Sequence, residues 1–132
     1  MPSPSQNIEC TLVVFSITGN NVLGFANEED VRNQINAVVV QTEAKHVILD
    51  LREIEYLQSA GFVPLLSLRR LIQQHRQGRV ILCHLQRDVH EVLLLTKMIN
   101  EAGDDTAPFE AQPDVPSAVE ALRPDLEKAS YV

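Results

Sequence analysis

The sequence predicts a small α/β domain with a mainly parallel mixed sheet, an N-terminal hairpin and about four helices. Its 132 residues suit a single domain, and 45% hydrophobic with 22% charged residues is close to the globular average. Two continuous apolar runs, at 46–51 and 79–85, alternate with helical patterns, which is typical of parallel strands covered on both faces. We therefore expect one domain over residues 1–132, with its core at about 8–123 and flexible ends.

The beginning of the chain predicts the hairpin. Residues 8–17 are rich in β-branched and apolar types, and TGNN at 18–21 supplies turn formers before VLGF at 22–25. We therefore expect two antiparallel strands in this region.

Two helices follow from caps and apolar periodicity. Asn27 precedes an acidic first turn, which favours a helix over about 28–42. Apolar positions at helical spacing predict a second, amphipathic helix from Ala60 or Phe62 to about residue 77, ended by Gly78.

Two further helices are predicted from capping-box spacings. Asp88 and the glutamate three residues later mark the start of one helix, which Gly103 would close. Ser117 repeats this spacing and starts a short last helix that Pro124 would shorten. A weak extended segment at 107–110 lies between the two helices.

The loop after the 46–51 strand is the first place to look for function, because α/β domains place their sites outside the carboxyl ends of the strands. Ser59 lies there at the start of the next helix, and Gly61 allows close backbone approach. Ser59 is predicted to be a helix N-cap. A phosphate on its hydroxyl would also face free N–H groups and the positive end of the helix dipole.

The run from His46 to Ile99, with VILDL, REIEYLQSAGF, VILCHL and DVHEVLLLTKMI, resembles the STAS domain of anti-sigma-factor antagonists. This resemblance implies a single STAS-like domain in which a partner serine kinase, itself an anti-sigma factor, phosphorylates Ser59. It also implies a partner-binding surface made of Gln58, Ser59, Ala60, Gly61 and Phe62.

The expected function is therefore that of a phosphoprotein regulator in signal transduction and transcription, acting by protein–protein interaction and not as an enzyme. The family has an aspartate where this chain has Gln58, and Pro64 stands in the first turns of the following helix. Gln58 supports the alternative of a non-switching STAS scaffold or ligand-binding module in a larger signalling or transport assembly. A homodimer is left open.

Charge and apolar run length exclude other classes of partner. A net charge of −7 opposes direct binding to nucleic acid. The N-terminus has no basic region ahead of an apolar one, and no apolar run approaches the roughly 20 residues that cross a bilayer, so we expect a cytoplasmic protein without membrane insertion. Cys10 and Cys83 are interpreted as core residues.

The alternative functions that involve catalysis each lack a residue that their chemistry requires. Asp50 as a receiver-type phosphoacceptor would need Mg²⁺ and further carboxylates, which the segment at 16–21 does not supply. Ser59 as a hydrolase nucleophile would need a glycine where Leu57 stands. The HExxH-like string at His90 has Leu94 in place of its second histidine. We therefore expect no cofactor and no metal.

Overall fold

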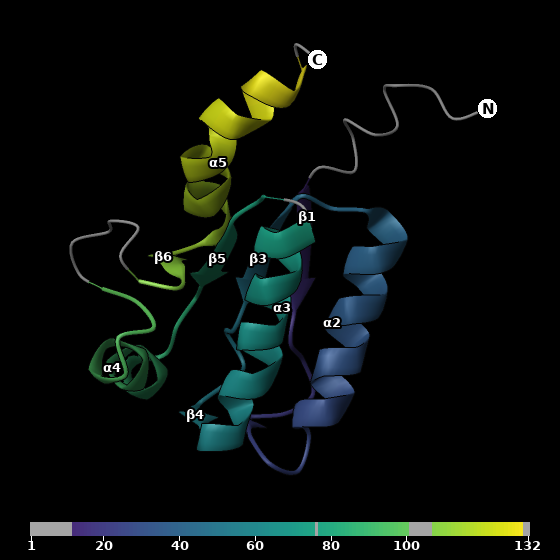
Figure 1. Cartoon of the computed structure of the whole chain (residues 1–132). Helices are drawn as coiled ribbons and strands as arrows, with labels where there is room; N and C mark the ends of the chain where they lie inside the picture. The colour runs from purple at the N-terminus through teal and green to yellow at the C-terminus, as the bar shows by residue number, and fades with distance from the viewer. Residues whose placement is uncertain (1–11, 76, 101–106, 131–132) are drawn as a thin grey trace.

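The computed structural model describes residues 12–75, 77–100 and 107–130 (Figure 1). The elements in chain order are β1 (Leu12–Ser16), β2 (Val22–Leu23), α2 (Glu28–Thr42), β3 (His46–Asp50), β4 (Tyr56–Leu57), the 3-10 helix η1 (Ser59–Gly61), α3 (Phe62–His75), β5 (Val80–Cys83), α4 (Arg87–Leu95), β6 (Glu110–Gln112) and α5 (Val115–Ser130).

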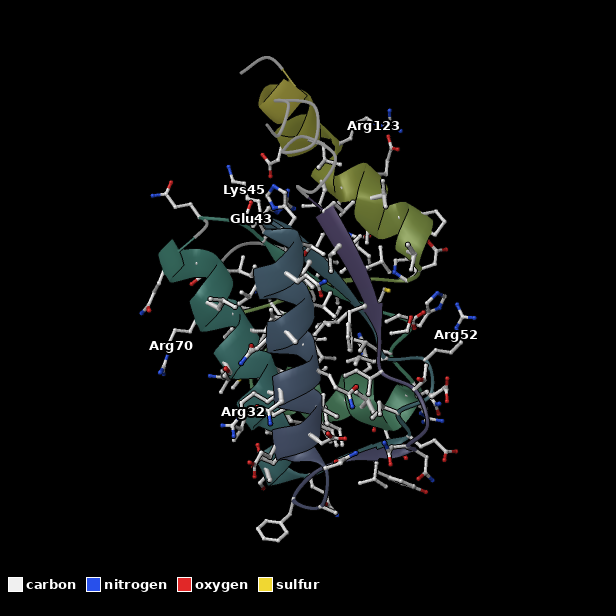
Figure 2. All side chains as sticks on the ribbon, turned by 90° about the vertical axis from the view of Figure 1, so that its right-hand side faces the viewer. Arg32, Glu43, Lys45, Arg52, Arg70 and Arg123 are labelled. Atoms are coloured by element: carbon white, nitrogen blue, oxygen red, sulfur yellow. The ribbon has the colours of Figure 1, made fainter. Side chains whose placement is uncertain are left out.

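The main sheet has the strand order β1-β3-β5-β6, and all of its strand pairs are parallel. A second sheet consists of β2 and β4, also parallel. In Figure 1 α2 and α3 lie side by side on one face of the main sheet, and α4 lies beyond the ends to which the strands point. Figure 2 shows α5 on the opposite face.

The core follows from the strand alternation. Val47 and Leu49 of β3 pack in the larger core cluster under α2 and α3. Ile48, which points the other way, packs with Ile81 and with Leu122 of α5 in a second cluster. All five side chains are completely buried. The continuous apolar runs therefore belong to strands covered on both faces, which confirms the predicted α/β class and mainly parallel sheet.

The predicted N-terminal hairpin is wrong. Among the described residues, β1 pairs with β3 and β2 pairs with β4, both in parallel. The Ile17 N–H donates to the Asp50 carbonyl, 3.2 Å away, so the chain continues alongside β3 past the end of β1. The turn after Ile17 then carries Asn21 to the start of β4, where its carbonyl accepts from Glu55 and Tyr56. Turn formers indicate a change of direction but not the strand that is paired next.

The N-cap of α4 is Gln86, two residues before the predicted Asp88, and the helix ends well before Gly103, which is outside the described residues. Arg87 is the first residue of α4 and Leu95 the last. The backbone of Lys97 is left-handed at φ 63°, and the Met98 N–H donates back to the Leu93 carbonyl over 2.9 Å. This left-handed cap ends the helix without a glycine.

The last helix also differs from the prediction at both ends, because it begins earlier and continues further. Asp114, not Ser117, caps it: the Asp114 carboxylate accepts from the Ser117 N–H over 2.8 Å, and α5 begins at Val115. Pro124 lies inside the helix, which continues to Ser130, so the predicted shortening is wrong. The predicted helix over 28–42 is confirmed. The first residues of the predicted core, 8–11, lie outside the described residues, as does Cys10.

The amino ends of β3 and β5 are joined to α5 by a partly buried polar network. His46 is buried, and its Nδ1 accepts from the Arg79 N–H over 3.0 Å. The Arg79 guanidinium pairs with both carboxylate oxygens of Glu110 and, at 2.9 Å, with Asp125. Burial lowers the pKa of His46, an effect that the Asp125 charge partly opposes. Within the described ranges, no helix is long and apolar enough to cross a bilayer.

Candidate functional site

The predicted switch residue lies between β4 and α3. Ser59 is exposed and begins η1, which continues directly into α3. The N-cap position belongs to Gln58, whose backbone is extended, and no side-chain capping bond forms there. The prediction that Ser59 is the N-cap is therefore wrong by one residue. Its hydroxyl stands at the start of the helix without a capping role.

Gly61 holds this turn against β2, as its predicted role in close backbone approach requires. A methyl group on Gly61 would overlap the Leu23 carbonyl oxygen and lie 2.7 Å from Leu57 Cδ1. The Gly61 N–H donates to the Gln58 carbonyl over 2.8 Å. Only a residue without a side chain fits, so Gly61 fixes where Ser59 stands relative to β2.

Gln58 ties the turn to a second loop. Its N–H donates to the Leu23 carbonyl over 3.0 Å, and its side-chain oxygen accepts from the Phe25 N–H over 3.3 Å. Phe25, in the loop between β2 and α2, is 87% exposed. Phe25 could not be identified from the sequence, because nothing local distinguishes it from a core phenylalanine.

Exposed apolar side chains flank Ser59 on the neighbouring elements. Tyr56 of β4 is 56% exposed, and Val63 and Leu66 lie one turn apart on α3 and are also exposed. We call Phe25, Tyr56, Ser59, Val63 and Leu66 the Ser59 surface. Large exposed apolar groups around a polar centre are typical of protein interaction sites.

The other predicted contact residues differ in exposure. Gln58 is exposed, Ala60 and Phe62 are half-buried, and Gly61 is buried. The structure therefore brings the predicted residues into one turn, with Gly61 in a supporting position and Phe25 as an addition.

A second group of polar side chains lies at the carboxyl ends of β3 and β5. The group consists of Asp50, Cys83 and His84, and each contributes one possible ligand atom. These three atoms lie within 4.8 Å of one another. Arg52 Nη2 is 2.8 Å from His84 Nε2 and 3.8 Å from Asp50 Oδ2. Burial and the negative charge of Asp50 raise the pKa of the Cys83 thiol to about 11. As predicted, Cys83 is buried; it is free of any disulfide.

A cleft of about 150 Å³ opens beside this group, lined by Ser16, Ile17, Thr18, Asp50, Arg52 and Glu53. Spacing rules for metal motifs could not find the group, because Asp50 and Cys83 meet through strand pairing and not through sequence proximity.

Three comparisons place the chain among known proteins. A family model described as STAS domain matches residues 5–110. The chain is 32% identical over 79 residues to "Putative anti-sigma factor antagonist BtrV" of Bordetella bronchiseptica, a match that covers 60% of this chain. It covers 66% of that protein, so the chain spans just under two thirds of the length of this relative.

The fold is similar to that of a solved structure, the anti-sigma factor antagonist SpoIIAA in its unphosphorylated form. The TM-score is 0.65 at 19% identity, over 86% of this chain and 89% of the other. This likeness bears on the fold, which is the small α/β domain described above.

Proposed function

The chain belongs to the STAS-domain family, and on this premise we propose that it is a regulator of the anti-sigma-factor antagonist type. It binds an anti-sigma factor that is also a serine kinase, and phosphorylation of Ser59 releases it. The observation that carries this proposal is the exposed Ser59 at the start of η1, which leads into α3, with exposed apolar residues on the neighbouring elements. The anti-sigma factor antagonists to which the chain is similar support the anti-sigma-factor part of the proposal.

In the unmodified state the Ser59 surface provides the contact. Phe25 and Tyr56 offer aromatic groups, the type that most often dominates binding energy in interfaces. Gln58 and Gly61 hold the two loops in place through their bonds and contacts with β2. The surface is therefore built before the partner arrives, which lowers the entropic cost of binding.

Phosphorylation changes the charge at the centre of this surface. A phosphate adds about −1.5 to −2 charges and three acceptor oxygens. Glu53 and Glu55, both exposed, precede Ser59 in the same segment and already make it acidic. In the free protein the start of α3 stabilises the phosphate, because helix N-termini favour anions. In the complex the phosphate would have to be desolvated against an apolar partner surface, so the complex dissociates.

The test uses the anti-sigma kinase from the same cells with ATP. Intact-mass measurement should show one added phosphate on the native protein and none on Ser59→Ala. Ser16→Ala is the matched control, because Ser16 is also exposed but lies at the end of β1, and it should be modified like the native protein. An unmodified native protein, or phosphate on Ser59→Ala, would contradict the switch.

Binding tests the other half of the proposal separately. Calorimetry should show that the native protein and Ser59→Ala bind the kinase, whereas the phosphorylated protein binds at least tenfold more weakly. Failure of all three to bind would contradict the assignment of the partner.

The second candidate is a constitutive STAS scaffold without a switch. It is favoured by Gln58, whose side chain bonds the Phe25 backbone and is therefore used in holding the loop. Affinity capture separates the two functions: a sigma-regulatory kinase among the partners supports the first, and a transporter or large signalling complex supports the second. In both, the protein acts in the cytoplasm as a binding partner and not as an enzyme.

A further inference from the structure

We propose that Asp50, Cys83 and His84 bind a divalent transition-metal ion of the zinc type, at a site separate from Ser59. A carboxylate oxygen, a sulfur and a ring nitrogen lie within 4.8 Å of one another. These three atom types are the ligands that Zn²⁺ takes in proteins, and three protein ligands with one open position are typical of sites that also hold water.

Strand pairing brings the ligands together. Asp50 is the last residue of β3 and Cys83 the last of β5, and the two are register partners, so their side chains point to the same face. His84 follows directly, with a left-handed backbone at φ 55°. Such a conformation costs free energy in a residue other than glycine and is concentrated at functional sites.

The position of Arg52 shows that these groups already attract a cation. A guanidinium only donates hydrogen bonds, so the 2.8 Å contact from Arg52 means that His84 Nε2 accepts with its lone pair. The Arg52 side chain is 67% exposed, and in Figure 2 it extends outward, so it can leave without opening the core.

The Asp50 carboxylate is also held in a position suited to metal binding. One of its oxygens accepts from the Arg52 N–H over 2.9 Å, while the other faces the Arg52 guanidinium at 3.8 Å. A ligand carboxylate fixed by a second hydrogen bond in this way is common around metals. Ligand atoms around a tetrahedrally coordinated ion lie about 3.4–3.8 Å from one another, so the three atoms must move closer together when the metal binds.

Binding exchanges a proton for the metal. The Cys83 S–H bond breaks, the proton goes to solvent, and the sulfur lone pair forms the bond to the metal; no electron is transferred. Arg52 moves out, and a water molecule from the adjoining cleft takes the fourth position.

The experiment titrates the full chain with Zn²⁺ by calorimetry and with Co²⁺ by absorption spectroscopy. We expect one ion per chain and a thiolate-to-cobalt charge-transfer band. Cys83→Ser should abolish the band, and His84→Gln should weaken Zn²⁺ binding at least tenfold. His90→Gln is the control, because His90 is an exposed histidine on α4 outside the group, and it should bind like the native protein.

Arg52→Gln tests the displacement directly. Removal of the competing guanidinium should strengthen Zn²⁺ binding at least threefold. The site is refuted if the native protein binds no Zn²⁺, if Co²⁺ binds without the thiolate band, or if His84→Gln and His90→Gln bind equally. The cobalt band is measured on the native protein, so this test does not depend on the folding of a variant.

Discussion

Replacement of Gly61 by alanine should destabilise the protein more than any other single added methyl group at the candidate site. The methyl would overlap the Leu23 carbonyl oxygen and lie 2.9 Å from its carbonyl carbon and 2.7 Å from Leu57 Cδ1. Carbon atoms pack at about 3.5–4.0 Å, so η1 and β2 must move apart by about 1 Å. These obstacles include backbone, which cannot rotate away.

The cost follows from these contacts. Overpacking of this kind costs about 1–3 kcal/mol. The shift would also lengthen the 3.0 Å bond from the Gln58 N–H to the Leu23 carbonyl, which is worth about 1 kcal/mol. Alanine offsets about 0.4–1 kcal/mol of this cost, because it lowers the conformational entropy of the unfolded chain relative to glycine. We therefore expect the free energy of unfolding of Gly61→Ala to fall by about 1–3.5 kcal/mol in urea titrations.

Gly24→Ala is the comparison. Its methyl would meet only side-chain atoms, the Cδ and Cβ of Gln58 at 2.7 and 2.8 Å and its oxygen closer still. The outer atoms of that side chain can rotate away at the expense of the bond to the Phe25 N–H, whereas its Cβ moves only with the backbone, so we expect a loss of about 1–2 kcal/mol, smaller than that of Gly61→Ala. Gly61→Ala within 0.5 kcal/mol of the native protein, or Gly24→Ala as the costlier change, would refute the reasoning.

Three further predictions concern other parts of the chain. Folding lowers the pKa of His46. As the pH falls through about 6.5, His46 is therefore protonated in the unfolded chain before it is protonated in the folded protein. The free energy of unfolding then decreases by up to about 1.4 kcal/mol per pH unit below that value. Urea titrations at two pH values should show a larger loss for the native protein than for His46→Asn. Arg79→Met should lower the free energy of unfolding by about 1–3 kcal/mol, because Glu110 and Asp125 lose their ion pairs with Arg79; equal stability would exclude a role for the network. Phe25→Ala should change stability by less than about 0.5 kcal/mol but weaken kinase binding at least tenfold in calorimetry; unchanged affinity would remove Phe25 from the interface.

Much of the fold could be predicted because its signals are local. The strands at 46–51 and 79–85 are continuous apolar runs, and the helix over 28–42 has an acidic first turn and apolar positions on one face. The rule that places sites after parallel strands indicated the loop that contains Ser59, and the role of Ser59 stays a prediction.

The errors concern helix ends and interactions between distant residues. The strand paired with β1 depends on the whole sheet, so the turn at 18–21 could not identify it. The end of α4 is set by a left-handed lysine, Lys97, a conformation that lysine seldom adopts. The contact of Gln58 with Phe25 and the meeting of Asp50 with Cys83 arise from tertiary register, which no local motif encodes.

The all-parallel pairing of the described strands has a consequence for folding kinetics. Each pair in the main sheet joins residues roughly 30 positions apart, such as Leu12 with His46 and Ile81 with Glu110. Every pairing therefore requires closure of a long loop before any strand contact stabilises it. A hairpin would have provided a local starting point. Without one, β3 must first meet β1 and β5 while α2 and α3 pack over them, and we expect slower folding than in helical domains of this size.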